Sequence, residues 1–144
     1  MNQVNIQFTK TNPLAKIPTR NFNSDTGFDV YSVENSLIPA RGSNVVDVGL
    51  NFAFITPGFW VKIEGRSGLG FKHGIAPHPG IIDQGYRSTA GIKLYNNTDV
   101  DYVVLVGDRI AQFVVYKNYE VTMSEAESIE MTDRGENGFG SSGK

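Results

Sequence analysis

The chain has no cysteine among its 144 residues, which excludes disulfide bridges, thiolate metal sites and a cysteine nucleophile. It also has no uninterrupted apolar run of the length that a signal peptide or a membrane-spanning helix needs. Neither sign of charge predominates, because the formal net charge is -2. The chain also has no long run of like charges of the kind that would predict a broad surface for nucleic acid or membrane. We therefore expect a soluble cytoplasmic protein, located in the host cytoplasm if a virus or phage encodes it.

What the sequence does contain is a series of short strand-like runs. Runs rich in Val, Ile, Phe and Tyr recur between Gly, Pro and Asn, and 40% hydrophobic residues suffice for one core, in which we expect Trp60. Only 67–74 and 124–130 favour a helical turn. These patterns predict an all-β sandwich or jelly-roll-like barrel over residues 1–132 and a flexible Gly- and Ser-rich arm over 133–144. The strand-like runs cover 5–10, 27–33, 44–55, 58–65, 80–83, 89–96 and 100–119.

The C-terminal arm, DRGENGFGSSGK, carries side chains that a plain flexible tail does not need. Its glycines make it costly to order. The guanidinium of Arg134 and the hydroxyls of Ser141 and Ser142 suit a polyphosphate, and the ring of Phe139 suits a flat base. This combination predicts a lid that closes over a nucleotide.

Two earlier stretches carry polar residues that strand formation does not require. Asp29 interrupts an apolar strand, which indicates a carboxylate that is either exposed at the surface or paired with a cation. Arg66, Ser67 and Gly68 follow a strand and lead into the first predicted helical turn. They form either a plain Gly-rich turn or an oxyanion site with side-chain and backbone donors.

Two later stretches also carry polar residues that strand formation does not require. The segment 80–96 contains two strand-like pieces on either side of the turn residues QGYRS. This pattern predicts a hairpin with Asp83 at the end of its first strand. Asp83 is then either a turn-capping residue or a carboxylate that takes a proton from water. Arg109 and Gln112 interrupt a strongly apolar strand, which indicates a cavity wall or pairing with Asp108 or another carboxylate.

Taken in order, the stretches TGFDVYS, GRSGLG, GIIDQGYR with GIKLYN, GDRIAQF and RGENGFGSSG resemble the five motifs of the trimeric deoxyuridine triphosphatases. The resemblance runs from about Thr26 to Gly143. It implies a jelly-roll fold, a homotrimer, and hydrolysis of dUTP to dUMP and pyrophosphate, which keeps uracil out of DNA and supplies dUMP. Each active site would draw on three chains: the motifs of Asp29, Arg66 and Gln112 from one, that of Asp83 from a second, and the arm from a third.

The resemblance also implies roles for single residues. Asp83 would activate the water that attacks the α-phosphorus, and Tyr86 would lie against the deoxyribose and exclude a 2′-hydroxyl. Mg²⁺ would be held mainly by the triphosphate, with Asp29 assisting through water. The backbone at Gly91 and Ile92 would bind uracil. The other substrate-binding residues would be Arg66, Ser67, Gly68 and Gln112 for the α- and β-phosphates, and Arg134, Gly140, Ser141 and Ser142 with Phe139 in the arm.

Some residues depart from the family pattern or favour other readings. Ser88 and Thr89 differ from the usual turn residues, and Glu136 often has a smaller counterpart.

Deoxycytidine triphosphate deaminase shares the fold but needs a glutamate where Lys93 stands. A non-catalytic nucleotide-binding or regulatory protein with a protein partner is the alternative of another class. The histidines, His73 and His78, have no cysteine or acidic cluster at ligand spacing, which favours loop packing over zinc.

Overall fold

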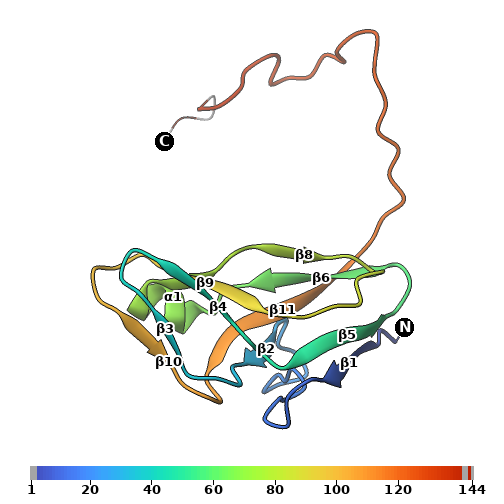
Figure 1. Ribbon diagram of the computed structural model, residues 1–144. Coiled ribbons are helices and arrows are strands. Elements are labelled where there is room, and N and C mark those ends of the chain that lie inside the picture. The colour runs from blue at the N-terminus through green and yellow to red at the C-terminus, as the bar shows by residue number, and fades with distance from the viewer. Residues whose placement is uncertain (1–2, 141–142, 144) are drawn as a thin grey trace.

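The computed structural model describes residues 3–140 and 143. In this part of the chain, eleven β-strands and one short α-helix form a single body, from which the C-terminal arm leaves (Figure 1). The all-β prediction is confirmed. The elements are β1 (Ile6–Lys10), β2 (Phe28–Tyr31), β3 (Ser36–Ile38), β4 (Ser43–Val46), β5 (Leu50–Ile55), β6 (Phe59–Glu64), α1 (Ser67–His73), β7 (Ile75–Pro77), β8 (Gly80–Ile82), β9 (Ile92–Asn96), β10 (Tyr102–Val104) and β11 (Arg109–Lys117).

The strands form four antiparallel groups. The largest has the order β2-β11-β6-β8, a second has the order β4-β9-β7, and β1 pairs with β5 as β10 pairs with β3. Helix α1 lies at the end of the body near β10, and the N-terminus lies at the opposite end near β1 and β5 (Figure 1). The long central strand β11 therefore holds β2 and β6 side by side, and these three strands carry three of the polar motifs.

The core follows from the period-2 alternation of the strands. In β9, for example, Ile92 and Leu94 are buried while Lys93 between them is exposed. Aromatic rings fill the centre: Phe52 packs against Phe8 and Phe113, with centroids 4.8 and 5.5 Å apart. This spacing is typical of tilted aromatic pairs in a packed core.

The predicted run 44–55 is two strands rather than one. Gly49 between β4 and β5 has φ +66, and a Cβ there would lie 2.9 Å from the Cβ of Asn12. Glycine is therefore required both by conformation and by space. The turn lets the chain leave β9, the partner of β4, and pair with β1.

The predicted run 100–119 likewise contains two strands, β10 and β11, and three further predictions from the sequence are wrong. The segment 80–96 is not a two-stranded hairpin, because β8 pairs with β6 whereas β9 pairs with β4 and β7. Residues 124–130 form no helix. Trp60 is not in the core but half-buried at the sheet surface, where it stacks on Tyr116 with ring centroids 4.8 Å apart. By contrast, the predicted helical turn at 67–74 is confirmed as α1.

The chain leaves the body after β11. The backbone N–H of Asn118 donates to the carbonyl oxygen of Gly58, 2.8 Å away, and the following residues extend away from the sheets and turn back above β8 (Figure 1). Within the described residues, no helix is long and apolar enough to cross a membrane.

Candidate active site

Asp29, Arg66 and Gln112 are brought together by the pairing of β11 with both of its neighbours. Gln112 on β11 is in register with Asp29 on β2 and with Glu64 at the end of β6. Arg66 follows β6, and its Nε lies 2.9 Å from Asp29 Oδ1. Gln112 Nε2 donates to the carbonyl oxygen of Gly65, 2.8 Å away. Three motifs that are far apart in the sequence therefore meet at one end of β6.

The carboxylate of Asp29 has a second cationic neighbour. Arg109 Nη1 lies 3.6 Å from Asp29 Oδ2, and Arg66 Nη1 donates to the carbonyl oxygen of Arg109 at 3.5 Å. The sequence left open whether Arg109 pairs with Asp108 or with another carboxylate, and the structure selects Asp29. Two guanidinium groups facing one carboxylate leave a local excess of positive charge, which suits an anionic ligand.

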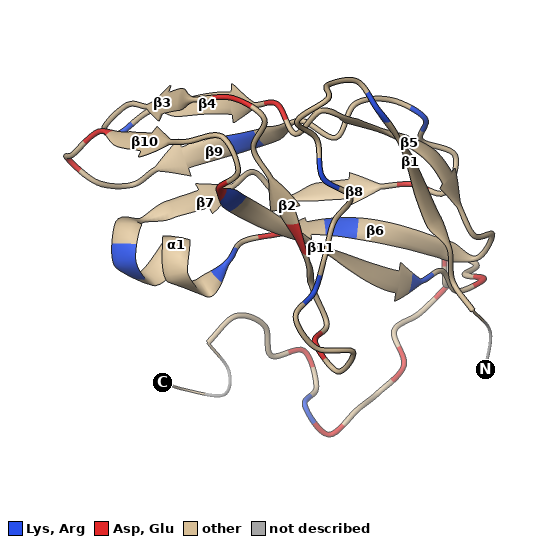
Figure 2. Ribbon diagram, turned by 90° about the horizontal axis from the view of Figure 1, so that it is seen from below, with Lys and Arg blue, Asp and Glu red and all other residues tan. Residues whose placement is uncertain are grey.

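Helix α1 begins directly after this cluster. Arg66 is its N-cap residue with extended backbone, and the first turn contains no acidic residue. As in any helix, the first amide N–H groups, here those of Ser67 and Gly68, lack partners within the helix. A Cβ at Gly68 would meet nothing within 4 Å, so a ligand can approach its backbone closely. Figure 2 shows one basic segment within α1 and another directly beside it.

Asp83 and Tyr86 lie in the segment that crosses from β8 to β9. Asp83 directly follows β8, is exposed, and accepts the backbone N–H of Tyr86 with its own carbonyl oxygen at 3.0 Å. In the described part of the chain, its carboxylate has no hydrogen bond or ion pair. The hydroxyl of Tyr86 donates to the carbonyl oxygen of Thr89 at 2.7 Å, and its ring meets the edge of Phe52.

The residues after Tyr86 are attached to β5. Phe52 N–H donates to the carbonyl oxygen of Ser88, and Ala90 N–H donates to that of Leu50, each at 3.0 Å. Ser88 and Thr89, the residues that depart from the family pattern, thus hold this segment through their backbone carbonyl groups. Beyond them, Gly91 is half-buried and Ile92 is buried.

Asp83 and Arg66 are distant from each other within one chain. Ile82 pairs with Val61, so Asp83 lies beside the first half of β6, whereas Arg66 lies beyond its other end. At a strand rise of about 3.3 Å per residue, their separation along β6 is about 20 Å. A single chain therefore does not bring the Asp83 carboxylate to the Arg66 guanidinium.

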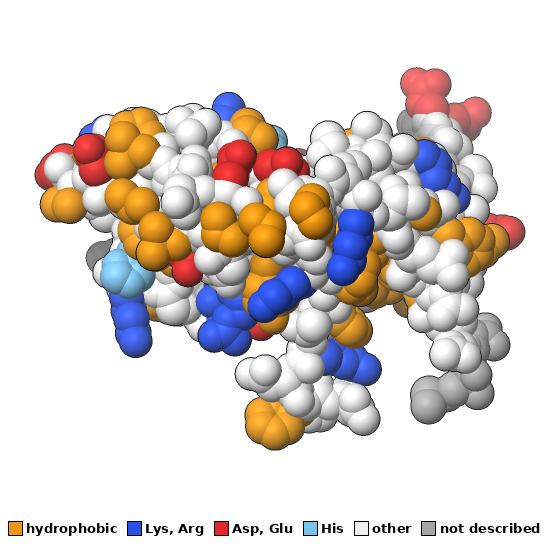
Figure 3. Space-filling model, turned by 60° about the horizontal axis from the view of Figure 1, so that its bottom comes forward, with side chains coloured by type: hydrophobic (Ala, Val, Ile, Leu, Met, Phe, Trp, Pro, Cys, Tyr) orange, Lys and Arg blue, Asp and Glu red, His pale blue; other side chains and the backbone are white. Residues whose placement is uncertain are grey.

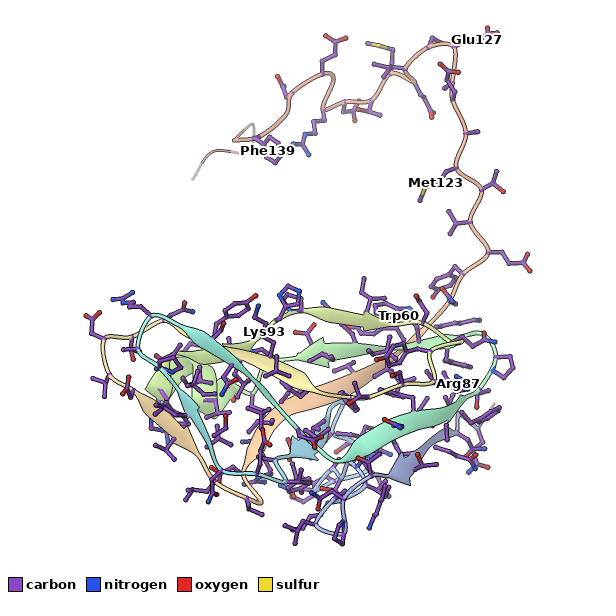
Figure 4. The ribbon with its side chains drawn as sticks, in the orientation of Figure 1. Trp60, Arg87, Lys93, Met123, Glu127 and Phe139 are labelled. Carbon is purple, nitrogen blue, oxygen red and sulfur yellow. The ribbon has the colours of Figure 1, made fainter. Side chains whose placement is uncertain are left out.

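The described residues of the arm form no hydrogen bond or ion pair with Asp83 or Arg66. Figure 4 shows it standing away from the body, with Phe139 near its end on the side where Trp60 and Lys93 also point. Phe139 is fully exposed, and Arg134 donates to the carbonyl oxygens of Asn137 and Gly138 at 2.9 and 3.0 Å. Gly140 has φ +79 in a turn at the end of the arm. The last two predicted ligands, Ser141 and Ser142, lie outside the described residues.

The two histidines pack against tyrosines. His78 Nδ1 is hydrogen-bonded to the hydroxyl of Tyr95 at 2.9 Å, and the ring of His73 lies 5.2 Å from that of Tyr102. His78 lies between β7 and β8, whereas His73 is not in a loop but is the last residue of α1. Lys93, the residue weighed against the deaminase alternative in the sequence, is exposed, with its ammonium group 5.4 Å from the centre of the Tyr95 ring.

Comparisons with known proteins agree with these motifs. A family model described as dUTPase matches residues 14–143. The deoxyuridine 5′-triphosphate nucleotidohydrolase of Kluyveromyces lactis is 39% identical over 131 residues, which cover 90% of this chain and 88% of that protein. The Arabidopsis thaliana protein of the same name is 39% identical over 134 residues, covering 93% of this chain and 80% of that protein.

A solved structure extends the likeness to the whole fold. The dUTPase of Staphylococcus bacteriophage 80alpha, in complex with dUPNHPP, superposes with a TM-score of 0.87 at 26% identity and covers 100% of both chains. The jelly-roll-like fold is thereby confirmed. Since the family model spans most of the chain and the relatives are well above 30% identical, the protein belongs to the dUTPase family.

Proposed function

We propose that the protein hydrolyses dUTP to dUMP and pyrophosphate, and so keeps uracil out of DNA and supplies dUMP for thymidylate synthesis. The observation that carries this proposal is the cluster of Asp29, Arg66 and Gln112 in a chain of the dUTPase family. The relatives named deoxyuridine 5′-triphosphate nucleotidohydrolase support the choice of substrate.

In the proposed reaction, Asp83 accepts a proton from a water molecule as the water oxygen attacks the α-phosphorus. The bond from the α-phosphorus to the oxygen that bridges it to the β-phosphorus breaks, and pyrophosphate leaves with the electron pair. An exposed carboxylate without a hydrogen bond or ion pair in the described part of the chain is suited to this role. Arg66, Gln112 and the backbone N–H groups of Ser67 and Gly68 would stabilise the negative charge on the phosphate oxygens.

The nucleoside would bind along the segment from Tyr86 to Ile92. The hydrogen bond from Tyr86 to Thr89 holds the ring in place, so that its face can exclude a 2′-hydroxyl. A Cβ at Gly91 would lie 3.4 Å from Val45 Cγ1, an ordinary contact, and the backbone there is not left-handed. The chain itself would accept a side chain at 91, which supports a role for the glycine in close approach of the uracil ring.

Magnesium fits this site as an ion carried mainly by the substrate. The described residues contain no group of three or more His, Cys, Asp or Glu placed to hold a metal ion. Asp29 faces two arginines but retains lone pairs for a hydrated ion. Mg²⁺ keeps several waters and favours phosphate oxygens, so one carboxylate acting through water is sufficient. When bound, the ion would neutralise charge on the triphosphate. A solved phage phi11 dUTPase is described as coordinating a structural Mg(II) ion.

We further propose that three chains share each site. The distance of about 20 Å between Asp83 and Arg66 in one chain supports this arrangement. A groove of about 520 Å³ also lies open in the single chain, with Phe8, Phe28, Phe59 and Phe113 among its apolar lining residues. In the segment between β11 and the arm, Tyr119, Val121 and Met123 alternate with polar residues and are exposed, which is the pattern of a strand without its sheet.

The function is tested by measuring pyrophosphate release from dUTP, UTP, dTTP and dCTP, first with magnesium and then with a chelator. We expect release from dUTP alone and its loss on chelation. Tight dUTP binding without release would favour a nucleotide-sensing protein, and ammonia release from dCTP would favour a deaminase.

Shared sites are tested by complementation. The inactive variants Asp83→Asn and Arg66→Gln are unfolded together in denaturant, refolded as a mixture, and assayed. If each site takes these residues from different chains, the mixture contains some intact sites and regains activity that neither variant has alone. Light scattering checks that the refolded mixture forms trimers. If it does and the mixture is still as inactive as each variant alone, the shared site is contradicted.

A further inference from the structure

A pocket of about 420 Å³ lies next to the Arg66 cluster and extends beyond the residues assigned above. One wall is formed by Arg66 and by α1, through Gly68, Leu69, Lys72 and His73. The rest of the lining comes from Tyr102 and Val104 of β10, from Gly107 and Asp108, and from Arg109 and Ile110 at the start of β11. On the face shown in Figure 3, basic side chains and a histidine lie beside exposed hydrophobic ones.

The charges around this pocket favour an anion. Arg66, Lys72 and Arg109 line it, and the one carboxylate in its lining is Asp108. Asp108 Oδ2 already accepts the backbone N–H of Leu105 at 2.9 Å. Asp29, which pairs with both arginines, is a second carboxylate near the pocket. The count is therefore three cationic side chains against two carboxylates. Lys72 has no ion pair in the described part of the chain, so its ammonium group is available to a ligand.

Lys72 is placed to continue the phosphate site. Gly68 and Lys72 are four residues apart on α1 and both line the pocket, as expected for neighbours on one helix face. The phosphates proposed to bind at Arg66 and Gly68 would therefore enter this pocket at one end. A lysine is a mobile point charge with three donors, and it can follow the outer phosphates of a bound triphosphate as they separate.

Tyr102 adds a hydroxyl to the pocket lining. Burial raises the pKa of Tyr102, and the nearby carboxylate of Asp108 raises it further. The phenol therefore stays protonated at neutral pH and can donate a hydrogen bond. The ring of His73 packs against that of Tyr102 and holds it at the pocket wall.

We propose that Lys72 binds the β- and γ-phosphates of dUTP in this pocket and holds the pyrophosphate product before it leaves. The inference rests on the proposed function and adds a binding residue to it. Lys72 takes no part in the proton transfer assigned to Asp83. It acts on the leaving half of the substrate and not on the nucleoside monophosphate.

The test compares Lys72→Gln with wild type and with a control, Lys10→Gln, which removes an exposed lysine of β1 outside the pocket. Calorimetry in magnesium gives the Kd of three ligands: inorganic pyrophosphate, the non-hydrolysable α,β-imido analogue of dUTP, and dUMP. We expect Lys72→Gln to weaken the first two about tenfold and to leave dUMP within twofold, since one lost charge-assisted contact is worth about 1.4 kcal/mol. Lys10→Gln should change none of them, and Lys72→Arg should recover most of the loss.

The proposal is overturned if Lys72→Gln binds pyrophosphate and the analogue within twofold of wild type while its Tm is unchanged. It is also overturned if dUMP binding falls as much as pyrophosphate binding, because that result means a general disturbance of the site. The proposed function fails if wild type releases no pyrophosphate from dUTP. Binding of pyrophosphate is measured without dUTP, so failure of the Lys72 proposal can be distinguished from failure of the proposed function.

Discussion

Arg66 and Asp29 form an ion pair, with Arg66 Nε 2.9 Å from Asp29 Oδ1, that joins the ends of two strands separated by β11. The two side chains are 27% and 18% exposed, so the pair lies between a surface ion pair and a buried one. Such a pair contributes little to stability when solvent reaches it. Its main effect is to fix the guanidinium at the mouth of the proposed phosphate site, where Arg109 adds a second positive charge.

Arg66→Lys keeps the charge but loses the planar guanidinium that contacts both Asp29 and the Arg109 carbonyl oxygen. We expect kcat/KM for dUTP to fall about 100-fold, as when one donor to developing charge is removed. The free energy of unfolding should fall by no more than about 1 kcal/mol. Initial rates and urea unfolding measure the two effects. Arg41→Lys, at an exposed pair with Asp99, is the control and should change neither. A rate within threefold of wild type would contradict the assignment of Arg66.

Asp83→Asn preserves the shape of the side chain and removes its ability to take a proton. We expect kcat to fall about 1000-fold, within the range for a general base, while the Kd of a non-hydrolysable dUTP analogue stays within about threefold. Single-turnover rates and calorimetry separate the two quantities. Asp99→Asn, at an exposed position, is the control. Full turnover by Asp83→Asn would remove Asp83 from the mechanism.

Tyr86→Phe and Tyr86→Ala form a matched pair for the sugar site. Phenylalanine keeps the ring that meets Phe52 and loses the hydrogen bond to Thr89, at a cost of about 1 kcal/mol in stability. Alanine loses the ring itself. We expect the preference for dUTP over UTP, as a ratio of kcat/KM values, to survive in Tyr86→Phe and to fall at least tenfold in Tyr86→Ala. An unchanged ratio in Tyr86→Ala would show that another group excludes the ribose.

Tyr102 gives a prediction for stability at alkaline pH. Burial, and then the Asp108 carboxylate, raise the pKa of Tyr102 above its ordinary value of 10.0. Above pH 10 the unfolded chain therefore loses this proton more readily than the folded one, and the free energy of unfolding falls as pH rises. Tyr102→Phe should flatten this fall between about pH 9.5 and 11, measured by urea unfolding relative to wild type. An identical slope in both proteins would mean that the folded environment does not hold the proton.

The sequence predicted the strands better than their partners. Alternation in β9 is local, and it revealed the strand because Ile92 and Leu94 face the core. The pairing of β9 with β4 and β7, and of β8 with β6, depends on contacts between distant segments, which a turn signal such as QGYRS does not encode. The hairpin prediction failed for this reason.

The same distinction applies to the site. Residue type and spacing were sufficient to make Asp29 and Gln112 candidates, because polar residues in apolar strands need partners, and to make Arg66 a candidate because it stands in a Gly-rich stretch after a strand. They could not decide between Asp108 and Asp29 as the partner of Arg109, because that choice depends on how β2 packs beside β11. The role proposed for Lys72 gave no sequence signal, since a lysine near a helix end is ordinary and the proposal depends on the pocket that Lys72 lines.

Removal of residues 134–144 tests the arm as a lid. In the described structure this segment packs against nothing in the body, and Arg134 bonds only to carbonyl oxygens of its own turn. We therefore expect Tm to change by no more than about 1 °C. We expect kcat/KM for dUTP to fall at least tenfold, because the arginine and the ring of Phe139 would be lost from the closed site.

Phe139→Ala in the full-length chain separates the two contributions of the arm. An aromatic ring that is fully exposed in the open arm gains by stacking on a base, so its removal should weaken dUTP binding with no effect on Tm. If the truncated protein hydrolyses dUTP as fast as wild type, closure of the arm is not part of the reaction. If the truncation slows hydrolysis but Phe139→Ala does not, the arm acts through its phosphate contacts alone, and base stacking drops out of the mechanism.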